Sequence, residues 1–357
     1  MPLTVVSDTM PSSARESWAD LLKVIAILAV ITIHASAPLL VRYKETGLSA
    51  WWVANMYNSL SRWCIPVFFM LSGCFLVPKA GKSLSFFLLR RVQRIVIPFI
   101  IWSFIYFKWR VLYYGQDLSL SAFFPMLISE PIYYHLWFFY VLIVLYFLAP
   151  ILSIYFQNSK PSINGYFLLL WFFAASVYPL LERFLGFSTF FSFGNVETSL
   201  HYLGFFMMGY LLRDIQLNSV ERLFFFLLFL CGLFLTSFGS YFLSIVKKEG
   251  VFDDFFYIYY TPNVAIMAVS VFLLMKSIPF PKAGILLSFV ASCVPGIFLV
   301  HAMVIALLKQ GVLGITVNEV TYGPVWGIPL FTGVIFILSL LVIAPIKLVP
   351  GLKYIVP

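Results

Sequence analysis

The sequence predicts an all-α integral membrane protein, built as a bundle of about ten transmembrane helices. Hydrophobic residues make up 62% of the 357 residues and charged residues only 10%, whereas a soluble domain is nearer a quarter charged. Phenylalanine alone occurs 40 times, and the mean hydropathy is +0.98. No globular core of this size hides so much apolar surface, so we expect lipid to be the solvent.

Each expected span is a run of about 20 mainly apolar residues, the length that crosses a bilayer as a helix. The first contains the stretch KVIAILAVITIH, residues 23–34. We expect it to be an uncleaved transmembrane helix, because the segment before it is not distinctly basic, as a secretory signal would be. The ten expected spans are 18–40, 51–77, 94–114, 136–156, 165–183, 196–212, 222–246, 257–276, 285–309 and 325–346.

The segments between the spans are too short for a folded soluble domain. We therefore expect one transmembrane domain over residues 18–346, with tails at 1–17 and 347–357. An even number of spans puts both tails on the same side. Placing them in the cytoplasm gives thirteen Lys and Arg in inner segments against eight in outer ones, as the positive-inside rule requires. A basic cytoplasmic side also accounts for the net charge of +9 without a nucleic-acid partner.

The four cysteines all lie in apolar segments, and their spacing matches no metal or redox motif. We expect them to be small buried hydrophobes, and we expect no metal site. They are Cys64, Cys74, Cys231 and Cys293.

Two ionisable residues mark one face of the first span. Lys23 and His34 are eleven residues apart, so on a helix they point within about 20° of each other and lie roughly 16 Å apart along the axis. Charges at membrane depth are costly and usually face a bundle interior or a wet cavity. The plainer alternative is a lysine that snorkels to the interface and a histidine satisfied by a backbone carbonyl.

The remaining histidines also map to the outer half or outer edge of their spans. His135 opens the fourth span, His201 opens the sixth and His301 lies inside the ninth, while Arg62 is midway along the second. Together with His34, these residues predict a polar cavity inside the bundle, open to the outside.

A basic cluster, RRVQRIVIP at residues 90–98, stands where the third span enters the membrane. Helical spacing puts Arg90, Arg91 and Arg94 on one edge. One interpretation is a topology anchor. The other is an anion site, because planar guanidinium groups bind phosphate in a bidentate manner. The sequence has no Walker loop or dinucleotide motif, so an ATP-type site is not expected.

These blocks resemble the acyltransferase 3 family of bacterial integral-membrane acyltransferases, most often O-acetyltransferases of surface polysaccharides. The resemblance begins with the cation and the histidine separated by ten residues in the first span, and with R-x-x-R before the third. Among the branches of the family, it is most similar to the one that acetylates N-acetylglucosamine of enterobacterial common antigen. Further matching blocks cover nearly the whole chain: SRWCIPVFFMLSG, YYHLWFFYVLIVLYFLAP, YLGFFMMGYLL and SCVPGIFLVHAMV.

The chain departs from the family at two points. The family commonly has arginine where this chain has Lys23, which keeps the charge but loses the planar fork. Many relatives carry an acidic stretch similar to HTWSLSVEEQ at the start of the fourth span, where this chain reads HLWFFYVL. Because Lys23 stands in place of the family's arginine, the contact that this side chain makes is open.

The resemblance implies a substrate pair and a location. The donor would be acyl-CoA, most often acetyl-CoA, in the cytoplasm, with no permanently bound cofactor. The acceptor would be a sugar hydroxyl of a cell-surface polysaccharide or its lipid-linked precursor, and the enzyme would lie among the lipids of the bacterial inner membrane. Two alternatives stand beside it. One is a transporter of a lipid-linked sugar or other solute, although the sequence lacks the inverted repeats that favour one. The other is a sensor or assembly subunit without turnover.

The resemblance also implies residue roles. His34 and Lys23 would be catalytic, with His34 as the general base for the sugar hydroxyl. Arg91 and Arg94, helped by Arg90, would hold the phosphates of coenzyme A. Transfer could be direct or pass through an acyl-histidine. From the chemistry of their side chains rather than from the resemblance, three further residues could stabilise the oxyanion or position the sugar: Arg62, His301 and His135.

Overall fold

The computed structural model describes residues 12–79, 83–186, 195–279, 281, 284–312, 314, 317–349 and 351–356. Every regular element in these ranges is a helix, which confirms the all-α prediction. Their bounds are α1 Ser12–Val41, α2 Tyr43–Ser61, α3 Cys64–Leu76, α4 Leu84–Arg91, α5 Ile97–Tyr114, α6 Phe123–Ser129, α7 Trp137–Asn158, α8 Pro161–Phe172, α9 Tyr178–Leu185, α10 Asn195–Leu211, α11 Ser219–Tyr241, α12 Pro262–Ser277, α13 Ile285–Lys309 and α14 Pro324–Leu348.

Nine helical segments among the described residues are long and apolar enough to cross a membrane. They match nine of the ten predicted spans, with the third beginning earlier than expected, at residue 84. The remaining predicted span, 196–212, corresponds to α10, which has 17 residues. At 1.5 Å per residue α10 is about 25 Å long, slightly short of the hydrocarbon thickness of a bilayer. The chain is therefore an all-α, multi-pass membrane protein.

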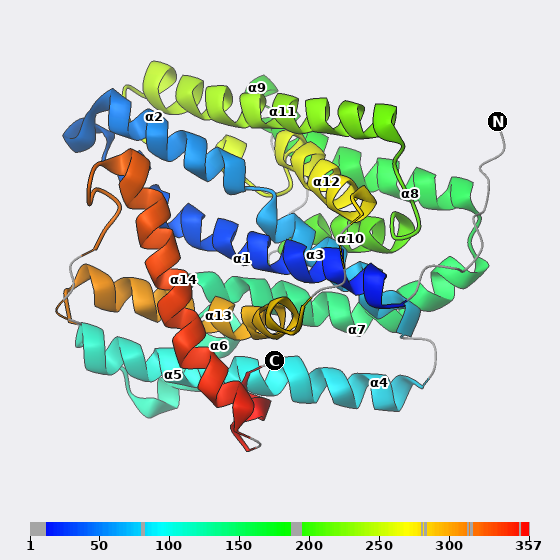
Figure 1. The fold of residues 1–357 in the computed structure, drawn as a ribbon, viewed down its shortest axis with the longest axis horizontal. Coiled ribbons are helices and arrows are strands. Elements are labelled where there is room, and N and C mark those ends of the chain that lie inside the picture. The colour runs from blue at the N-terminus through cyan, green and yellow to red at the C-terminus, as the bar shows by residue number, and fades with distance from the viewer. Residues whose placement is uncertain are drawn as a thin grey trace.

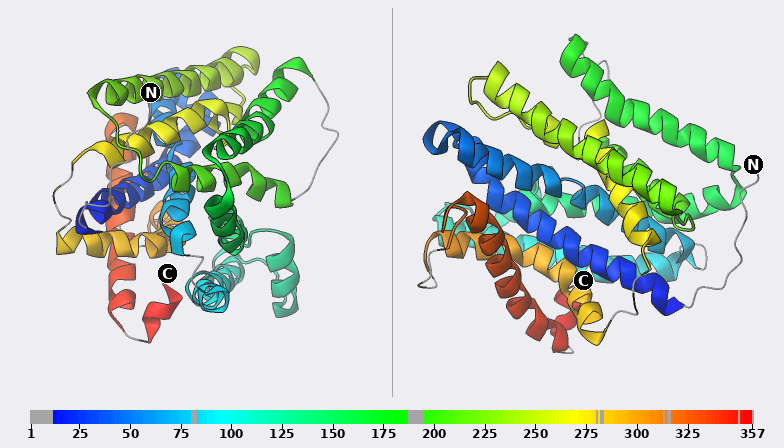
Figure 2. Two further views of the ribbon diagram at one scale, coloured as in Figure 1. Left: turned by 90° about the vertical axis from the view of Figure 1, so that its right-hand side faces the viewer. Right: turned by 45° about the horizontal axis from the view of Figure 1, so that its top comes forward.

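Most of the long helices lie side by side with their axes nearly parallel, and α14 crosses them at a steep angle (Figure 1). Helix α1 is central, because it packs against α2, α3, α12, α13 and α14. Figure 2 shows the same arrangement from two other sides, with α8 and α9 set apart from α1. The residues on α1 therefore face several other helices at once.

Helices α3 and α10 approach so closely that side chains are excluded between them. A Cβ at Gly73 would overlap the backbone carbonyl of Phe206, and one at Gly209 would overlap that of Met70. Small residues at such crossings are typical of helix packing in membranes. This contact fixes α3, whose other face lines the site described below.

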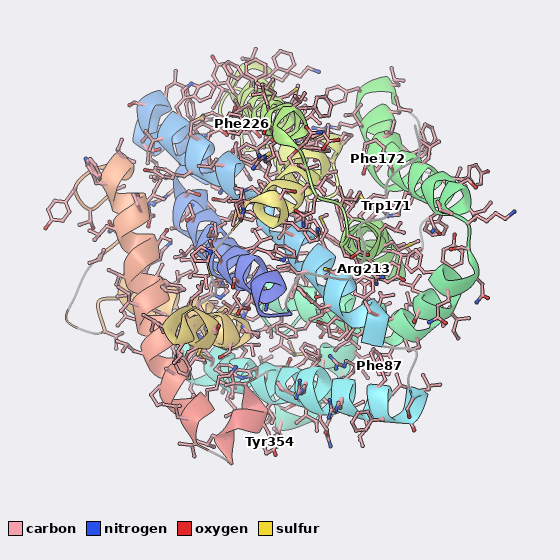
Figure 3. All side chains as sticks on the ribbon, turned by 45° about the vertical axis from the view of Figure 1, so that its right-hand side comes forward. Phe87, Trp171, Phe172, Arg213, Phe226 and Tyr354 are labelled. Atoms are coloured by element: carbon pink, nitrogen blue, oxygen red, sulfur yellow. The ribbon has the colours of Figure 1, made fainter. Side chains whose placement is uncertain are left out.

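The outer surface of the bundle is apolar, as lipid requires. Large hydrophobic side chains on α11 point outward, and Phe226, labelled in Figure 3, is 49% exposed. The interior instead carries polar groups, among them Asn55, Asn58, His135 and His301, all buried. Buried polar residues at membrane depth mark functional positions by default.

Two irregularities interrupt the second and third predicted spans. The second predicted span is broken between α2 and α3, at Arg62 and Trp63. The third carries a π-helical turn, Val92–Val96, between α4 and α5. π-helical turns change which face a side chain occupies and occur often at functional sites.

Candidate active site

A cavity of about 490 Å³ lies between α1, α3, α4, the 92–96 turn, α7 and α13. Its polar lining gathers side chains from distant parts of the chain. They are Asp20 and Lys23 from α1, Ser72 from α3, Arg91 and Arg94, and Tyr146 from α7. The volume falls in the range of small-molecule sites. Three of the predicted site residues, Lys23, Arg91 and Arg94, thus share one cavity.

Lys23 has a carboxylate partner in this cavity. Its Nζ lies 2.9 Å from Oδ1 of Asp20, one turn earlier on α1. The side chains are 35% and 17% exposed, so the pair stands at the cavity edge. The cation in the first span is therefore part of an ion pair, rather than an isolated charge that snorkels.

The arginine side of the cavity is less neutralised. Arg91 is half-buried, and its guanidinium lies 5.2 Å from the ring centroid of Phe87 and 5.9 Å from that of Tyr146. Its buried Nε has no hydrogen-bond partner. Tyr146 shares a hydrogen bond of 3.2 Å with Ser72. Guanidinium N–H groups of this kind suit an incoming anion.

Arg90 does not line the cavity. It is exposed, and its guanidinium lies 4.2 Å from the ring centroid of Phe86. The π-helical turn after Arg91 widens the helix, so Arg94 does not follow the register of a regular α-helix. The structure therefore brings Arg91 and Arg94 together at the cavity and places Arg90 outside it.

Three histidines meet beyond the cavity. The ring centroids of His34 and His301 are 5.3 Å apart, and those of His135 and His301 are 5.1 Å apart. They come from α1, the turn before α7, and α13. The fourth, His201, stacks on Tyr260 with centroids 4.0 Å apart, in another part of the bundle. No group of histidines or acidic residues in the described ranges is arranged to hold a metal ion.

Backbone carbonyls define the tautomers of two of these rings. Nδ1 of His301 lies 2.6 Å from the carbonyl of Phe298, and Nε2 of His135 lies 3.3 Å from that of Leu299. A carbonyl only accepts, so these nitrogens carry the protons. The opposite nitrogens, Nε2 of His301 and Nδ1 of His135, are buried without a partner. In the neutral rings both are acceptors.

His34 differs from these two rings. It is half-buried rather than fully enclosed, and no described residue forms a hydrogen bond with its ring. The ring lies 5.0 Å from that of Tyr134, which is 49% exposed. His34 is therefore the member of the cluster that a second molecule reaches first, past Tyr134.

Arg62 is connected to His34 through Asn58 rather than by direct contact. Its Nε donates to Oδ1 of Asn58 at 2.7 Å, and its Nη1 donates to the carbonyl of Tyr257 at 3.1 Å. Asn58 in turn donates to Oγ of Ser36 at 2.8 Å and to the carbonyl just before His34 at 3.1 Å. Arg62 thus fixes the α1 backbone beside His34 and does not line the cavity.

Several site residues lie outside the sequence-based set. Asp20 precedes the lysine by one helical turn, so the D-x-x-K spacing was a usable signal. Ser72 and Tyr146 form their bond across α3 and α7, and Phe138 and Phe298 close the cavity. No local pattern predicts such contacts between helices, because they depend on how the helices pack.

Comparisons with known proteins identify the family of the chain. The sequence model described as the acyltransferase domain, of the acyltransferase 3 type, matches residues 16–344, which includes all of the residues discussed above. No curated protein matches the chain. No solved structure matches it either. Because the family match covers most of its length, the chain belongs to the acyltransferase 3 family and is a membrane acyltransferase.

Proposed function

We propose that this protein is an O-acetyltransferase of the bacterial inner membrane. It would transfer an acetyl group from cytoplasmic acetyl-CoA to a sugar hydroxyl of a cell-surface polysaccharide or its lipid-linked precursor. The branch that acetylates enterobacterial common antigen is the first acceptor class to test. The observation that supports this proposal most is a cavity with cations at one side, adjoined at its other side by the histidine cluster.

The cationic side suits coenzyme A, which is a polyanion. Arg91 and Arg94 offer planar N–H donors to phosphate, and Lys23 adds a third positive charge. Asp20 offsets part of that charge, which favours a site that releases its product. A topology with the tails in the cytoplasm puts these residues at the inner side, where acyl-CoA is found.

His34 is the proposed general base. As the sugar oxygen attacks the thioester carbonyl carbon, His34 takes the hydroxyl proton and a C–O bond forms. The tetrahedral intermediate then collapses, the C–S bond breaks, and the leaving thiolate takes the proton from the imidazolium. The products are the acetyl ester and free coenzyme A, and neutral His34 is regenerated.

The tautomers separate the roles of the other histidines. An oxyanion needs a hydrogen-bond donor, but Nε2 of His301 and Nδ1 of His135 are acceptors in the neutral rings. We therefore assign His301 and His135 to positioning a sugar hydroxyl, from which they accept. Arg62 is a positioning residue for His34, acting through Asn58.

The acceptor would approach from the side of Tyr134. This ring is exposed and contacts His34, so a sugar stacked on it would bring a hydroxyl to the imidazole. Aromatic rings bind sugars through their apolar faces, much as they pack on other apolar surfaces. The donor and the acceptor would then reach the histidines from opposite sides.

The test is acetyl transfer by purified protein. Protein in lipid nanodiscs is incubated with acetyl-labelled acetyl-CoA and isolated surface glycans, and label in the glycan is counted. We expect label only when both substrates and the protein are present. Mass spectrometry of surface glycans from cells with and without the gene identifies the acceptor. Consumption of acetyl-CoA without label in any of the glycans offered would contradict the proposed acceptor class.

A further inference from the structure

The side of the donor cavity away from the cations is closed by aromatic rings. Phe138 and Phe298 both line the cavity, and their ring centroids are 4.9 Å apart. Phe139 adds a third ring, 5.9 Å from Phe298. All three side chains are buried, between 2% and 7% exposed. They form a continuous wall, defined here as the phenylalanine wall.

The histidines lie directly behind this wall. His301 follows Phe298 by three residues on α13, and His135 precedes Phe138 by three residues at the start of α7. The ring of Phe298 contacts both, with centroids 5.6 Å from His301 and 5.8 Å from His135. One layer of rings therefore separates the cavity from the reacting groups.

We infer that Phe138 and Phe298 select the length of the acyl group, an inference that rests on the proposed function. Coenzyme A held by its phosphates at the cationic side extends its thioester away from them, so the acyl group meets the phenylalanine wall first. To react, the thioester carbonyl must pass the phenylalanine wall and reach the histidines. An acetyl group needs a small displacement of the wall, whereas each further methylene must fit among rings that are already in contact.

The expected size of the donor preference follows from how strongly enzyme pockets discriminate between substrates that differ by one methylene. One methylene too many in a close-fitting pocket changes kcat/KM by roughly 10- to 200-fold. Wild type should therefore prefer acetyl-CoA over butyryl-CoA strongly. Replacing Phe298 by a smaller side chain removes a ring from the wall and should reduce that preference by at least about tenfold.

The experiment measures competition and turnover with the same variants in nanodiscs. Displacement of labelled acetyl-CoA by butyryl-CoA and by hexanoyl-CoA gives relative affinities without any acceptor. Transfer to the glycan gives the ratio of kcat/KM values. Phe298→Ala and Phe138→Ala are compared with Phe298→Leu and Phe138→Leu, which leave smaller voids should the alanine variants fail to fold. We expect both alanine and leucine forms to shift the ratios toward the longer donors.

Two control variants distinguish selection of acyl-chain length from a general loss of packing in the bundle. Phe75→Ala enlarges the same cavity beside Lys23, and its butyryl-to-acetyl ratio should stay that of wild type. Phe156→Ala removes a buried ring on α7 that stacks on Tyr210, outside the cavity, and should also keep the ratio. Folding is checked by size-exclusion chromatography and thermal melting.

The outcomes are distinct. Unchanged ratios in folded Phe298 and Phe138 variants would overturn the selection role and leave the proposed function intact. An equal shift of the butyryl-to-acetyl ratio in the Phe75 variant would also overturn the selection role, since the total volume of the cavity would then determine the preference. If wild type binds no acyl-CoA, the donor assignment itself fails, and the inference fails with it.

Discussion

The donor cavity and the histidine cluster adjoin each other but have opposite character. The cavity has charged groups at its edge, where Lys23 is 35% exposed and Arg94 is exposed. In the cluster, His301 and His135 are 0% and 2% exposed, and their contacts are mainly aromatic. Charges stay where solvation costs least, whereas the neutral rings of His301 and His135 are buried behind the half-buried His34. The difference indicates a division between binding and chemistry.

The largest expected effect is at the histidine cluster. His34→Ala removes the general base, and positioned bases contribute about 10²- to 10⁴-fold to rate. Acetyl transfer should therefore fall by about that factor while donor binding remains. The measurement is label transfer to glycan at matched protein amounts.

The matched control for that variant is another histidine outside the cluster. His201→Ala changes a ring that stacks on Tyr260, away from the donor cavity, and should leave transfer near wild type. Wild-type turnover by His34→Ala would remove His34 from the mechanism, and an equal loss in both variants would point to general destabilisation.

The next largest effect is expected on donor affinity. Charge-assisted contacts are worth about 1.5–3 kcal/mol, so Arg91→Ala and Arg94→Ala should each raise the Kd for acetyl-CoA by roughly 10- to 100-fold. Arg90→Ala is the neighbouring control, because Arg90 lies outside the cavity, and its Kd should change little. Donor affinity should also fall with added salt. If all three variants bind acetyl-CoA as tightly as wild type does, the arginines are only a topology anchor.

Lys23 should show an intermediate effect. Lys23→Gln leaves the Asp20 carboxylate without its partner and adds repulsion toward phosphates, so activity should fall by about tenfold. Lys23→Arg restores the charge and should keep a good part of the activity. The double variant Asp20→Asn/Lys23→Gln should recover some of the loss, which comparison of initial rates would detect. Equal activity of the glutamine and lysine forms would mean that this charge has no role.

The smallest effect on activity is expected at a third region, the 248–255 segment. Asp253 pairs with Arg183 at 2.5 Å and Lys248 at 2.8 Å, and accepts from the backbone N–H of Phe255 at 3.0 Å. Burial raises the pKa of Asp253, but the bonds from Lys248 and Phe255 and the charge of Arg183 lower it by more, so the net pKa is lowered.

A carboxyl group whose pKa is lowered by folding stabilises the fold at pH values above its pKa in the unfolded chain, near 3.9. This stabilisation is lost as the pH falls through the pKa of the folded state. Asp253→Asn should therefore lower the Tm at pH 7, and the difference from wild type should shrink in increasingly acidic buffer. Acetyl transfer at a temperature where both forms are folded should be nearly unchanged. A Tm difference that is independent of pH would contradict this electrostatic account.

The sequence predicted the fold well because lipid imposes one strong rule, long apolar helices, which hydropathy reads directly. It also predicts Lys23 and His34 on one face of the first span, and both residues lie on the single helix α1. It grouped His301 and His135 with His34, but it also included His201, which stacks on Tyr260 in another part of the bundle, because contacts between helices depend on how the helices pack. Arg90 was grouped with the cavity arginines because a π-helical turn cannot be read from spacing.

The most direct test of the division between binding and chemistry is equilibrium binding of labelled acetyl-CoA to two variants of the purified protein. His34→Ala should bind the donor as wild type does, although its acetyl transfer falls by about 10²- to 10⁴-fold. The double variant Arg91→Ala/Arg94→Ala should bind at least about tenfold more weakly. The opposite pattern, donor binding lost in His34→Ala and kept in the double arginine variant, would contradict the account.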